Sequence, residues 1–527
     1  MEGVGLLISW KMPLAIFSGM LLGLIIGVIP GMTAALGLAI ILPLTLSLDA
    51  LTALILMTSV YTGSLTGGGI LAILINTPGT PGAVATTLDG YPMTRKGLHN
   101  EALGLQISSS VIGGFLSYLV LLFAIEPMTW LALKFGSSEM LALTIFVIVF
   151  IGILQGKYLS RAIFAGVFGI LVSNIGTSVS TGVARGTFGF AELEDGVPLI
   201  ICIIGMFAIP ELLSLVNRKS ISDEDVQKEH NIQDLFKGIY KAIKKVKIWL
   251  TGSIVGIFVG VLPAAGAAIA SLSSYSLAKK FSKNKENFGK GEPDGVVAAE
   301  SANNASEGGS MAILLSLGIP GSASTAVILG GFMLHGLVPG GGLFRDNGPL
   351  VYGLIVGNLL QMIFLGFFAA FIAFYVGKIV KVKSYLLVPL LIILMSIGSF
   401  AYRNLIFDVY ILFIFGIIGW YLKKFEFTPL SFMIGLFLGR QIDEDIERVI
   451  ILFSDNPLKV FESTITSVIT LFTVLSLCYY FFFKNKNKKN WPKLLSIRTS
   501  WVIVKKQMEM IIPTLFCFVH RVSFLPR

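Results

Sequence analysis

Charged side chains are scarce in this sequence of 527 residues. Only 13% of the residues are Asp, Glu, Lys or Arg, whereas 54% are hydrophobic, and soluble proteins average about 25% charged residues. So few charges cannot cover a water-soluble surface of this size. We therefore expect the chain to reside in a lipid bilayer.

Cysteine, histidine and nucleotide-binding motifs are also scarce. The three cysteines and four histidines lack the spacing of a disulfide framework or a metal site; they are Cys202, Cys478, Cys517, His99, His230, His335 and His520. The chain has no Gly-x-x-x-x-Gly-Lys-Ser/Thr run, so an ATP loop is excluded, and no nucleophile stands beside a base. We expect no enzyme activity, no metal and no cofactor apart from a coupling ion.

Long apolar segments are what the chain does contain. A membrane-spanning helix needs about 20 mostly apolar residues, and such stretches include 103–125, 138–154, 197–216, 350–377, 385–400, 406–422 and 462–483. The sequence predicts an all-α polytopic membrane protein with about 10 to 13 transmembrane segments. The first apolar stretch lacks a small-residue cleavage site, so it is expected to be retained.

Basic residues indicate which parts face the cytoplasm. Residues 484–527 hold ten of the Lys and Arg residues and one acid, and the stretches 217–247 and 278–300 are also hydrophilic. Positively charged segments remain on the cytoplasmic side, where a basic tail contacts anionic lipid. Nucleic acid is not an expected partner.

The charge rule constrains the apolar segment 248–277, which lies between two of these hydrophilic stretches and is interrupted at Leu262-Pro-Ala-Ala-Gly266. A helical hairpin that enters the bilayer and returns would leave both flanks in the cytoplasm. The alternative is a broken spanning helix with basic residues on both sides. We favour the re-entrant hairpin.

An internal repeat divides the chain. Gly23-x-x-x-Gly27-Val-Ile-Pro30 matches Gly256-x-x-x-Gly260-Val-Leu-Pro263, and 79–86 matches 318–325 in the same order. We predict a first membrane repeat (1–216), a hydrophilic linker (217–247), a second membrane repeat (248–483) and a basic tail (484–527). Paired Gly/Pro-interrupted apolar segments indicate the binding site of a secondary transporter.

The interrupted segments predict a polar cavity, because non-helical backbone at membrane depth must be buried in protein or line water. We expect this for Tyr61–Gly69 and for the backbone breaks at Gly27, Pro30, Gly31, Gly79, Pro81, Gly82, Gly260, Pro263, Gly266, Gly318, Pro320 and Gly321. Free helix N-termini there would attract carboxylates, and free carbonyl groups would hold a cation.

Small polar side chains near the breaks are the candidate solute ligands. They are Ser64, Thr66, Asn76, Thr77, Thr80, Asn303, Asn304, Ser316, Ser322, Ser324 and Thr325. The alternative for small residues is close helix packing, and we favour packing for Gly23, Gly27, Gly256 and Gly260. The ion-coupling candidates are Glu300, Glu307 and Asp89, because acids at membrane depth are usually functional; their alternative is a place at the interface.

Several of these motifs resemble the large permease subunit of the tripartite tricarboxylate transporter family. The resemblance rests on Asn76-Thr-Pro-Gly-Thr-Pro-Gly82, the stretch Leu88-Asp-Gly-Tyr-Pro-Met-Thr-Arg-Lys-Gly97, Glu300-Ser-Ala-Asn-Asn-Ala305 and Gly318-Ile-Pro-Gly-Ser322. It covers about residues 5–483. In this sequence, Ala264 replaces the glycine of the family's Leu-Pro-Gly-x-Gly pattern, and Gly82 stands where Ala or Ser is usual.

The resemblance implies a multi-pass permease of the bacterial cytoplasmic membrane. It would work with a small membrane subunit and a periplasmic solute-binding protein, and take up carboxylates such as citrate with Na⁺ or H⁺. A passive channel for small polar solutes is the alternative from another class. The stretch 491–527 has no counterpart in the resemblance.

Overall fold

Helices account for nearly all of the structure, a computed structural model that describes residues 9–154, 158–178, 182–216, 231–379 and 384–481. Two short strands, β1 (Gly176–Thr177) and β2 (Ala184–Arg185), pair antiparallel. The prediction of an all-α membrane protein is confirmed. Met1–Val474 form one compact unit and Leu475–Arg527 a second one. The basic tail and the linker residues 217–230 lie outside the described residues.

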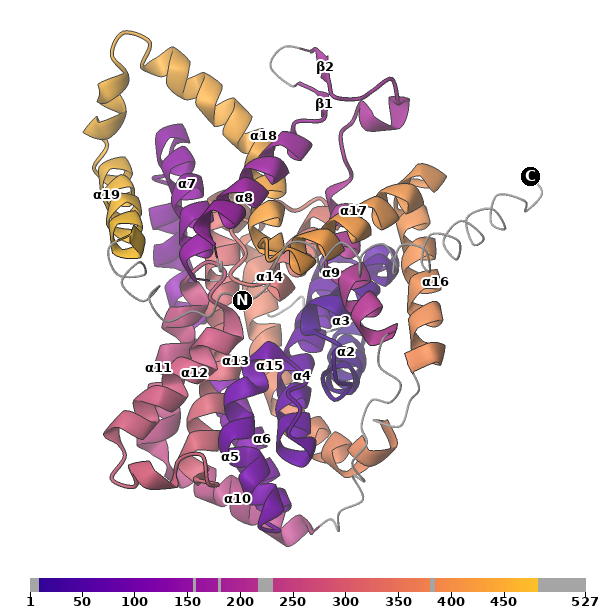
Figure 1. Cartoon of the computed structure of the whole chain (residues 1–527), viewed down its shortest axis with the longest axis vertical. Helices are drawn as coiled ribbons and strands as arrows, with labels where there is room; N and C mark the ends of the chain where they lie inside the picture. Colours follow the sequence, from indigo (N-terminus) through magenta and orange to yellow (C-terminus); the bar gives the residue numbers. More distant parts are fainter. Residues whose placement is uncertain (1–8, 155–157, 179–181, 217–230, 380–383, 482–527) are drawn as a thin grey trace, which may run out of the picture. The chain divides into compact units, whose positions relative to one another are not determined.

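The described residues of the first half form eight α-helices. They are α2 (Lys11–Gly27), α3 (Ala34–Ile41), α4 (Ala50–Ile75), α5 (Val84–Arg95), α6 (His99–Ala132), α7 (Ser137–Leu154), α8 (Leu159–Ser173) and α9 (Leu199–Val216), with short 3-10 turns η1 (Leu42–Ser47), η2 (Pro81–Ala83) and η3 (Ala191–Leu193). In Figure 1 these helices run from indigo to magenta.

The second half begins with α10 (Ile232–Lys244), which packs along α6. It continues with α11 (Val246–Val261), α12 (Gly266–Phe281), α13 (Pro293–Leu317), α14 (Ala323–Leu334), α15 (Gly341–Ile379), α16 (Ser384–Arg403), α17 (Ile406–Lys424), α18 (Pro429–Leu452) and α19 (Thr464–Tyr479), with turns η4 (Lys285–Asn287) and η5 (Pro457–Glu462). Helix α15 is kinked at Asn347, two residues before Pro349.

A helical hairpin opens the first repeat. Helix α2 runs inward, the chain reverses at Pro30 and Gly31, and α3 returns; Gly31 has a φ of 89°, which favours glycine. Lys11 at the start of α2 lies 4.0 Å from Asp49 at the start of α4, so the two helices begin at the same end. Both arms of the hairpin therefore open to one side.

An equivalent hairpin opens the second repeat. Helices α11 and α12 pack against each other, and a Cβ on Gly252 of α11 would lie 3.1 Å from Ser274 Oγ of α12. Because the two residues stand about equally far from Pro263, the chain reverses there. The reversal has the shape of the predicted hairpin, and its re-entry into a membrane stays a prediction. Lys245, just before α11, pairs with Asp294 in the first turn of α13.

The two repeats have opposite orientations. Their equivalent helices α4 and α13 cross antiparallel: Thr62 Oγ1 donates to Glu307 Oε1 (2.6 Å), and Asn304 Nδ2 donates to Thr66 Oγ1 (3.0 Å). As the residue numbers rise along α4 from Thr62 to Thr66, those of their partners on α13 fall from Glu307 to Asn304. The first hairpin consequently enters from one end of the molecule and the second from the other, the arrangement of inverted-repeat transporters.

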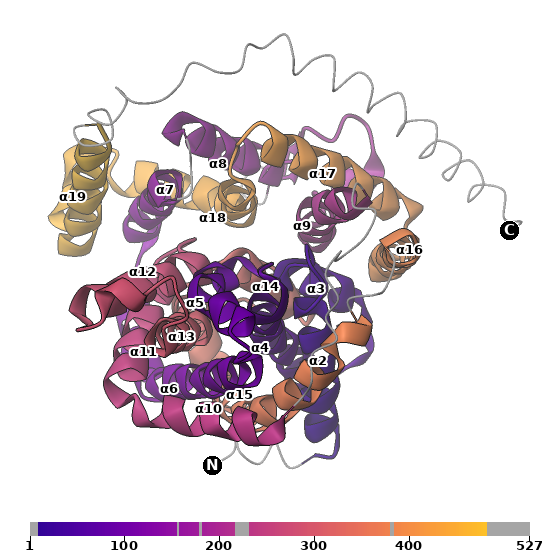
Figure 2. The same cartoon turned by 60° about the horizontal axis from the view of Figure 1, so that its bottom comes forward.

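Each repeat completes the other. Helix α6 packs along α13, and α15 packs along α4; α8 packs along α18, and α9 along α17. Figure 2 shows α7, α8, α9, α16, α17 and α18 as one layer, here called the scaffold layer. Helices α2–α6 and α10–α15 form the other, the hairpin layer, with α4 and α13 near its centre.

Two local expectations are wrong. Tyr61–Gly69 is regular helix within α4 and fully buried, not a backbone break. Its glycines instead permit close helix contact, since a Cβ on Gly63 would lie 2.7 Å from the carbonyl oxygen of Met20. Of the hydrophilic stretch 278–300, only 282–292 connects two helices; α12 ends at Phe281, α13 begins at Pro293, and Val296 to Glu300 are buried.

Five described helices are long and apolar enough to cross a membrane: α4, α6, α7, α15 and α17. Eight shorter apolar stretches of 10–17 residues include both arms of the first hairpin, α11 and α14. Helix α13 is absent from both groups because its sequence is polar, although nearly all of it is buried. The number of passes stays a prediction.

Candidate substrate cavity

A cavity of about 330 Å³ lies between the tips of the two hairpins, the breaks after α4 and α13, and the scaffold layer. Four helix beginnings line it: Thr33–Ala35 of α3, Thr80–Gly82 before α5, Ala265–Ala268 of α12, and Ser322–Ser324 of α14. Two come from each repeat. Helices α9, α17 and α18 provide the facing wall through residues such as Phe207, Gly419 and Leu430.

The local sequence explains why the chain breaks here. Asn76 directly follows α4 and Gly318 directly follows α13, and both have a positive φ (56° and 73°), which commonly stops a helix. Ser322 then begins α14 through a capping box in which its side chain accepts from Thr325 N. Thr33 begins α3 by accepting from Leu36 N.

These helix beginnings give the cavity its chemistry. The first backbone N–H groups of a helix lack intrahelical partners and carry the positive end of the helix dipole, so they bind carboxylates. Much of the remaining wall is alanine and glycine, including Ala34, Gly82 and Ala267, which leaves the backbone accessible. Tyr61 OH lies 3.4 Å from Ser322 Oγ and links the repeats across the cavity.

One ion pair stands at the cavity. Lys423 of α17 donates to Glu211 of α9 over 2.8 Å, and both residues line the cavity. The Lys423 side chain is 52% exposed, so the pair faces solvent and can be exchanged for other partners.

The candidate solute ligands occupy different places. Thr80, Ser322 and Ser324 line the cavity. Thr325 belongs to the capping box, Thr66 and Asn304 bond to each other, and Ser316 donates to Ala312 O. Ser64 is buried in α4. Asn76 is exposed at the end of α4, and Thr77 follows it outside the cavity lining.

Glu300 is fully buried in the hairpin layer. Its carboxylate accepts from the Thr86 hydroxyl of α5 and from Ser110 Oγ of α6 (2.9 Å), with longer contacts from Gln106 Nε2 (3.4 Å) and Asn303 Nδ2 (3.5 Å). Hydroxyl groups from two different helices therefore hold its two oxygens. A Cβ on Gly82 would strike the amide oxygen of Asn303, so Asn303 connects Glu300 to the cavity wall.

Glu307 is also fully buried but has a different environment. Its Oε1 accepts from Thr62 Oγ1 (2.6 Å) and Tyr118 OH (2.7 Å), while its Oε2 has no hydrogen-bond partner among the described residues. Thr62 in turn accepts from Gln361 Nε2 (2.9 Å), and Ser59 Oγ donates to Gln361 Oε1 (2.7 Å). This polar chain runs from α13 through α4 to α15.

Asp89, the third acid, holds a loop. One of its oxygens accepts from three backbone N–H groups, of Gly289, Gly291 and Glu292, at 2.7–2.8 Å. The other accepts from Tyr275 OH at 2.9 Å. These bonds fix the connection between α12 and α13, a structural task that accounts for its burial.

Sequence reasoning missed the partners of the buried acids. Gln106, Tyr118 and Gln361 come from 103–125 and 350–377, which were predicted as ordinary apolar spans, whereas Tyr61, Thr62 and Thr86 lie in the predicted interrupted segments. Polar residues such as Gln106 and Gln361 within those spans were the available signal, because uncharged polar groups in lipid also need partners.

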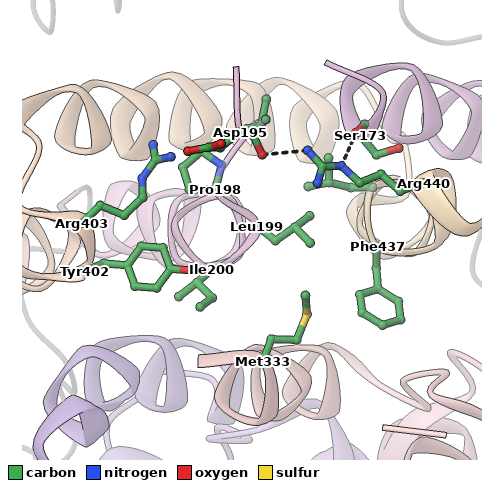
Figure 3. Close-up of a pocket in the computed structure, with 13 residues that line it drawn as sticks. Ser173, Asp195, Pro198, Leu199, Ile200, Met333, Tyr402, Arg403, Phe437 and Arg440 are labelled. Atoms are coloured by element: carbon green, nitrogen blue, oxygen red, sulfur yellow. Dashed lines mark hydrogen bonds between the residues drawn. The ribbon is translucent and has the colours of Figure 1, made fainter. Parts of the chain in front are cut away.

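A second cavity, of about 280 Å³, lies at the opposite end of α9. Figure 3 shows Arg403 and Arg440 on either side of Asp195, Pro198 and Leu199, with Met333 of α14 facing them. The first turn of α9 lines this second cavity, and later turns of the same helix line the first cavity.

Comparison with known proteins matches residues 14–434 to the model of the "Tripartite tricarboxylate transporter TctA family". An uncharacterized 52.8 kDa protein from the TAR-I ttuC' 3'region of Agrobacterium vitis is 34% identical over 441 residues, 83% of this chain and 86% of that protein. An uncharacterized protein from the TAR-II ttuC' 3'region of the same organism is 37% identical over 201 residues, 37% of this chain and 81% of that protein. No solved structure matches.

Proposed function

Because this chain belongs to the tripartite tricarboxylate transporter TctA family, we propose that it is the large permease of a binding-protein-dependent importer that takes up carboxylates with a cation. The observation that carries the proposal is the cavity lined by four helix beginnings, two from each repeat. We further propose the bacterial inner membrane as its location, and a small membrane subunit and a periplasmic binding protein as its partners.

The cavity supports an anionic solute. Four positive dipole ends converge on it, and at each of them unpaired N–H groups can donate to carboxylate oxygens. A solute with two or three carboxylates could engage helix beginnings of both repeats at once. Lys423 at the cavity would contribute one full positive charge once it leaves Glu211.

The buried acids support cation coupling. We propose that Glu300 and its amide neighbours contribute to a site for the coupling ion, because Asn303 Oδ1 and Gln106 Oε1 are buried oxygens without a hydrogen-bond partner among the described residues. Such oxygens suit Na⁺. Glu307, with one unpartnered oxygen and a polar chain beside it, suits proton exchange.

The inverted repeats support alternating access, in which the hairpin layer moves relative to the scaffold layer. Between these layers, α14 faces α9 and α18, so a shift there would close one cavity and open the other. We propose that the entrance of the second hairpin faces the cytoplasm. In support, α10 directly before this hairpin carries Lys237, Lys241 and Lys244, two of which pair with Glu101, and basic segments favour the cytoplasmic side.

Uptake by sealed vesicles that contain the complete three-component system tests the proposal. We expect citrate to accumulate against its own gradient while a cation gradient is maintained, and to equilibrate when an ionophore collapses that gradient. Uptake that continues unchanged after the collapse would favour a passive channel.

A further inference from the structure

The second cavity shares three helices with the substrate cavity. Helix α9 lines the substrate cavity through Met206, Phe207 and Pro210, and the second cavity through Val197 to Ile200. Helix α18 contributes Leu430 to the first and Arg440 to the second, and α14 contributes its first and last turns, respectively. On α9 the two linings are about 9 Å apart along the helix.

The ends of α9 set the direction of the second cavity. The first turn of α9 lines it, whereas α9 ends at Val216, directly before the hydrophilic linker 217–247. With the linker in the cytoplasm, the second cavity opens to the outer side, and it lies at the outer end of the interface between α14 and the scaffold layer.

Arg440 supplies a positive charge without an acidic partner there. Its Nη2 donates to the carbonyl oxygen of Asp195 (2.8 Å) and its Nε to the carbonyl oxygen of Ser173 (3.3 Å). No carboxylate of the described residues lies within 4.0 Å of it. Gly196 permits this approach, since a Cβ there would strike the Arg440 guanidinium. Backbone carbonyls thus hold the side chain in place without neutralising it.

Arg403 on the other side of the cavity is partly neutralised. It donates through Nε and Nη2 to the fully buried Asp408, with contacts of 2.5–3.2 Å. The Asp195 carboxylate is its second acidic neighbour (Figure 3). Asp443 pairs with Arg185 at 2.7 Å on the neighbouring surface. Arg440 is therefore the side chain that a bound anion could use.

We propose that the second cavity is an outer anion site, in which Arg440 receives a carboxylate of the solute before the solute enters the substrate cavity. This inference rests on the proposed function for its direction. A guanidinium held by carbonyls is pre-organised and can bind a carboxylate with two parallel hydrogen bonds. Charge at the mouth of the path also raises the local concentration of an anionic solute.

Labelling of a cysteine in the cavity tests the charge without requiring transport. Val197→Cys is introduced into the full chain with Cys202, Cys478 and Cys517 replaced by Ala or Ser. Intact cells then receive the membrane-impermeant anionic reagent sulfonatoethyl methanethiosulfonate or its cationic trimethylammonium analogue. Val338→Cys, exposed between α14 and α15, is the control position on the same side of the molecule.

At each position we compare the reaction rate of the anionic reagent with that of the cationic one. We expect this rate ratio to be about tenfold higher at position 197 than at position 338. Arg440→Gln should bring the two ratios together, and Arg440→Lys should preserve the difference. Equal ratios in the starting chain, or a ratio that Arg440→Gln leaves unchanged, would overturn the proposal. If Arg440→Gln does not insert, Asp195→Asn decides: removal of this acid must increase the preference for the anionic reagent.

Transport by the complete system separates this inference from the proposed function. If citrate accumulates, Arg440→Gln should raise the half-saturating external citrate concentration about tenfold with little change in maximal rate. Arg448→Gln, two turns further along α18 and paired with Glu444, is the matched control and should have no effect. An unchanged half-saturating concentration would contradict the outer site alone. Absence of citrate accumulation by the unaltered chain would contradict the proposed function instead.

Discussion

Helices α4 and α13 occupy equivalent places in the two repeats but carry different chemistry. The carbonyl oxygens of Ser64 and Ser306 face Gly27 and Gly260, and Asn76 and Gly318 cap the C-terminal ends of α4 and α13. Both pairs differ by 242 residues (306 − 64 and 318 − 76). Gly79 and Gly321, which lie against the carbonyl oxygens of Gly27 and Gly260, have the same offset, so the match of 79–86 to 318–325 is wrong by three residues. With this offset, Glu300 corresponds to Thr58 and Glu307 to Leu65. Glu300 and Glu307 of α13 therefore have no acidic counterpart on α4.

This difference separates two tasks. The shared backbone, with its hairpin, close glycine contacts and helix break, builds one half of the cavity in each repeat. In the proposed mechanism, the acids that only α13 has would bind or exchange the cation. Inverted symmetry explains the cavity, whereas the proposed coupling would depend on residues that differ between the repeats.

Glu300→Gln should produce the largest effect. The amide would place N–H groups against the hydroxyls of Thr86 or Ser110, which now donate to the carboxylate. We expect uptake in the complete system to fall by about tenfold to a hundredfold and its dependence on the cation gradient to disappear. Glu286→Gln, in the exposed turn before α13, should behave like the starting chain. Unchanged Na⁺ and pH profiles would give Glu300 a structural role only.

Glu307→Gln should have a smaller and different effect. The amide oxygen can keep both hydrogen bonds from Thr62 and Tyr118, and its NH₂ group can occupy the side without a partner. The variant resembles a protonated glutamate. We expect solute exchange across the membrane to continue, while the stimulation of uptake by acidic external medium is lost. Stimulation equal to that of the starting chain would show that Glu307 exchanges no proton.

Substitution of the equivalent glycines Gly23 and Gly256 should lower the free energy of unfolding by similar amounts. A Cβ on Gly23 would lie 2.8 Å from Val60 Cα, and one on Gly256 would lie 2.9 Å from Ala302 Cα. Each Gly→Ala change should lower the free energy of unfolding by about 1–3 kcal/mol, measured by thermal unfolding in detergent. Gly366→Ala, with 3.5 Å to its nearest neighbour, is the control. A large loss at only one of the two positions would contradict equivalent packing.

Ala264→Gly should have the smallest effect, a stabilisation. Ala264 has a φ of 62°, in the left-handed region, where its counterpart in the first hairpin is Gly31. Relief of this strain, partly offset by the flexibility of glycine when unfolded, should stabilise the chain by about 1 kcal/mol or less. Ala265→Gly at the adjacent position, with a φ of −65°, should destabilise it. Destabilisation by Ala264→Gly would show that the turn is not strained.

The sequence was informative where backbone chemistry is local. Proline and glycine at 30–31, 79–82, 263–266 and 318–321 predicted interruptions, and the structure has hairpin tips or helix breaks at each of them. The charges flanking 248–277 predicted a hairpin because both flanks favour the same side of a membrane. The low fraction of charged residues and the long apolar stretches predicted the fold class.

Long-range relations could not be read from the sequence. The glycine-rich run 61–69 resembles a break, but Gly63 and Gly67 permit close contact with another helix, α2, at Met20, Leu24 and Gly27. The sequence of helix α13 looks hydrophilic, but the helix is buried because its polar side chains find partners on α4, α5 and α6. The orientation of the repeats likewise depended on antiparallel contacts between α4 and α13.

Solute protection of one cysteine from each repeat tests the central claim that both repeats form one substrate cavity. Thr80→Cys and Ser322→Cys, each in a background without other cysteines, are reacted with a small maleimide in membranes of the complete system. The account predicts that citrate slows the reaction at both positions with the same concentration dependence. Protection at neither position, or at only one of them, would contradict it.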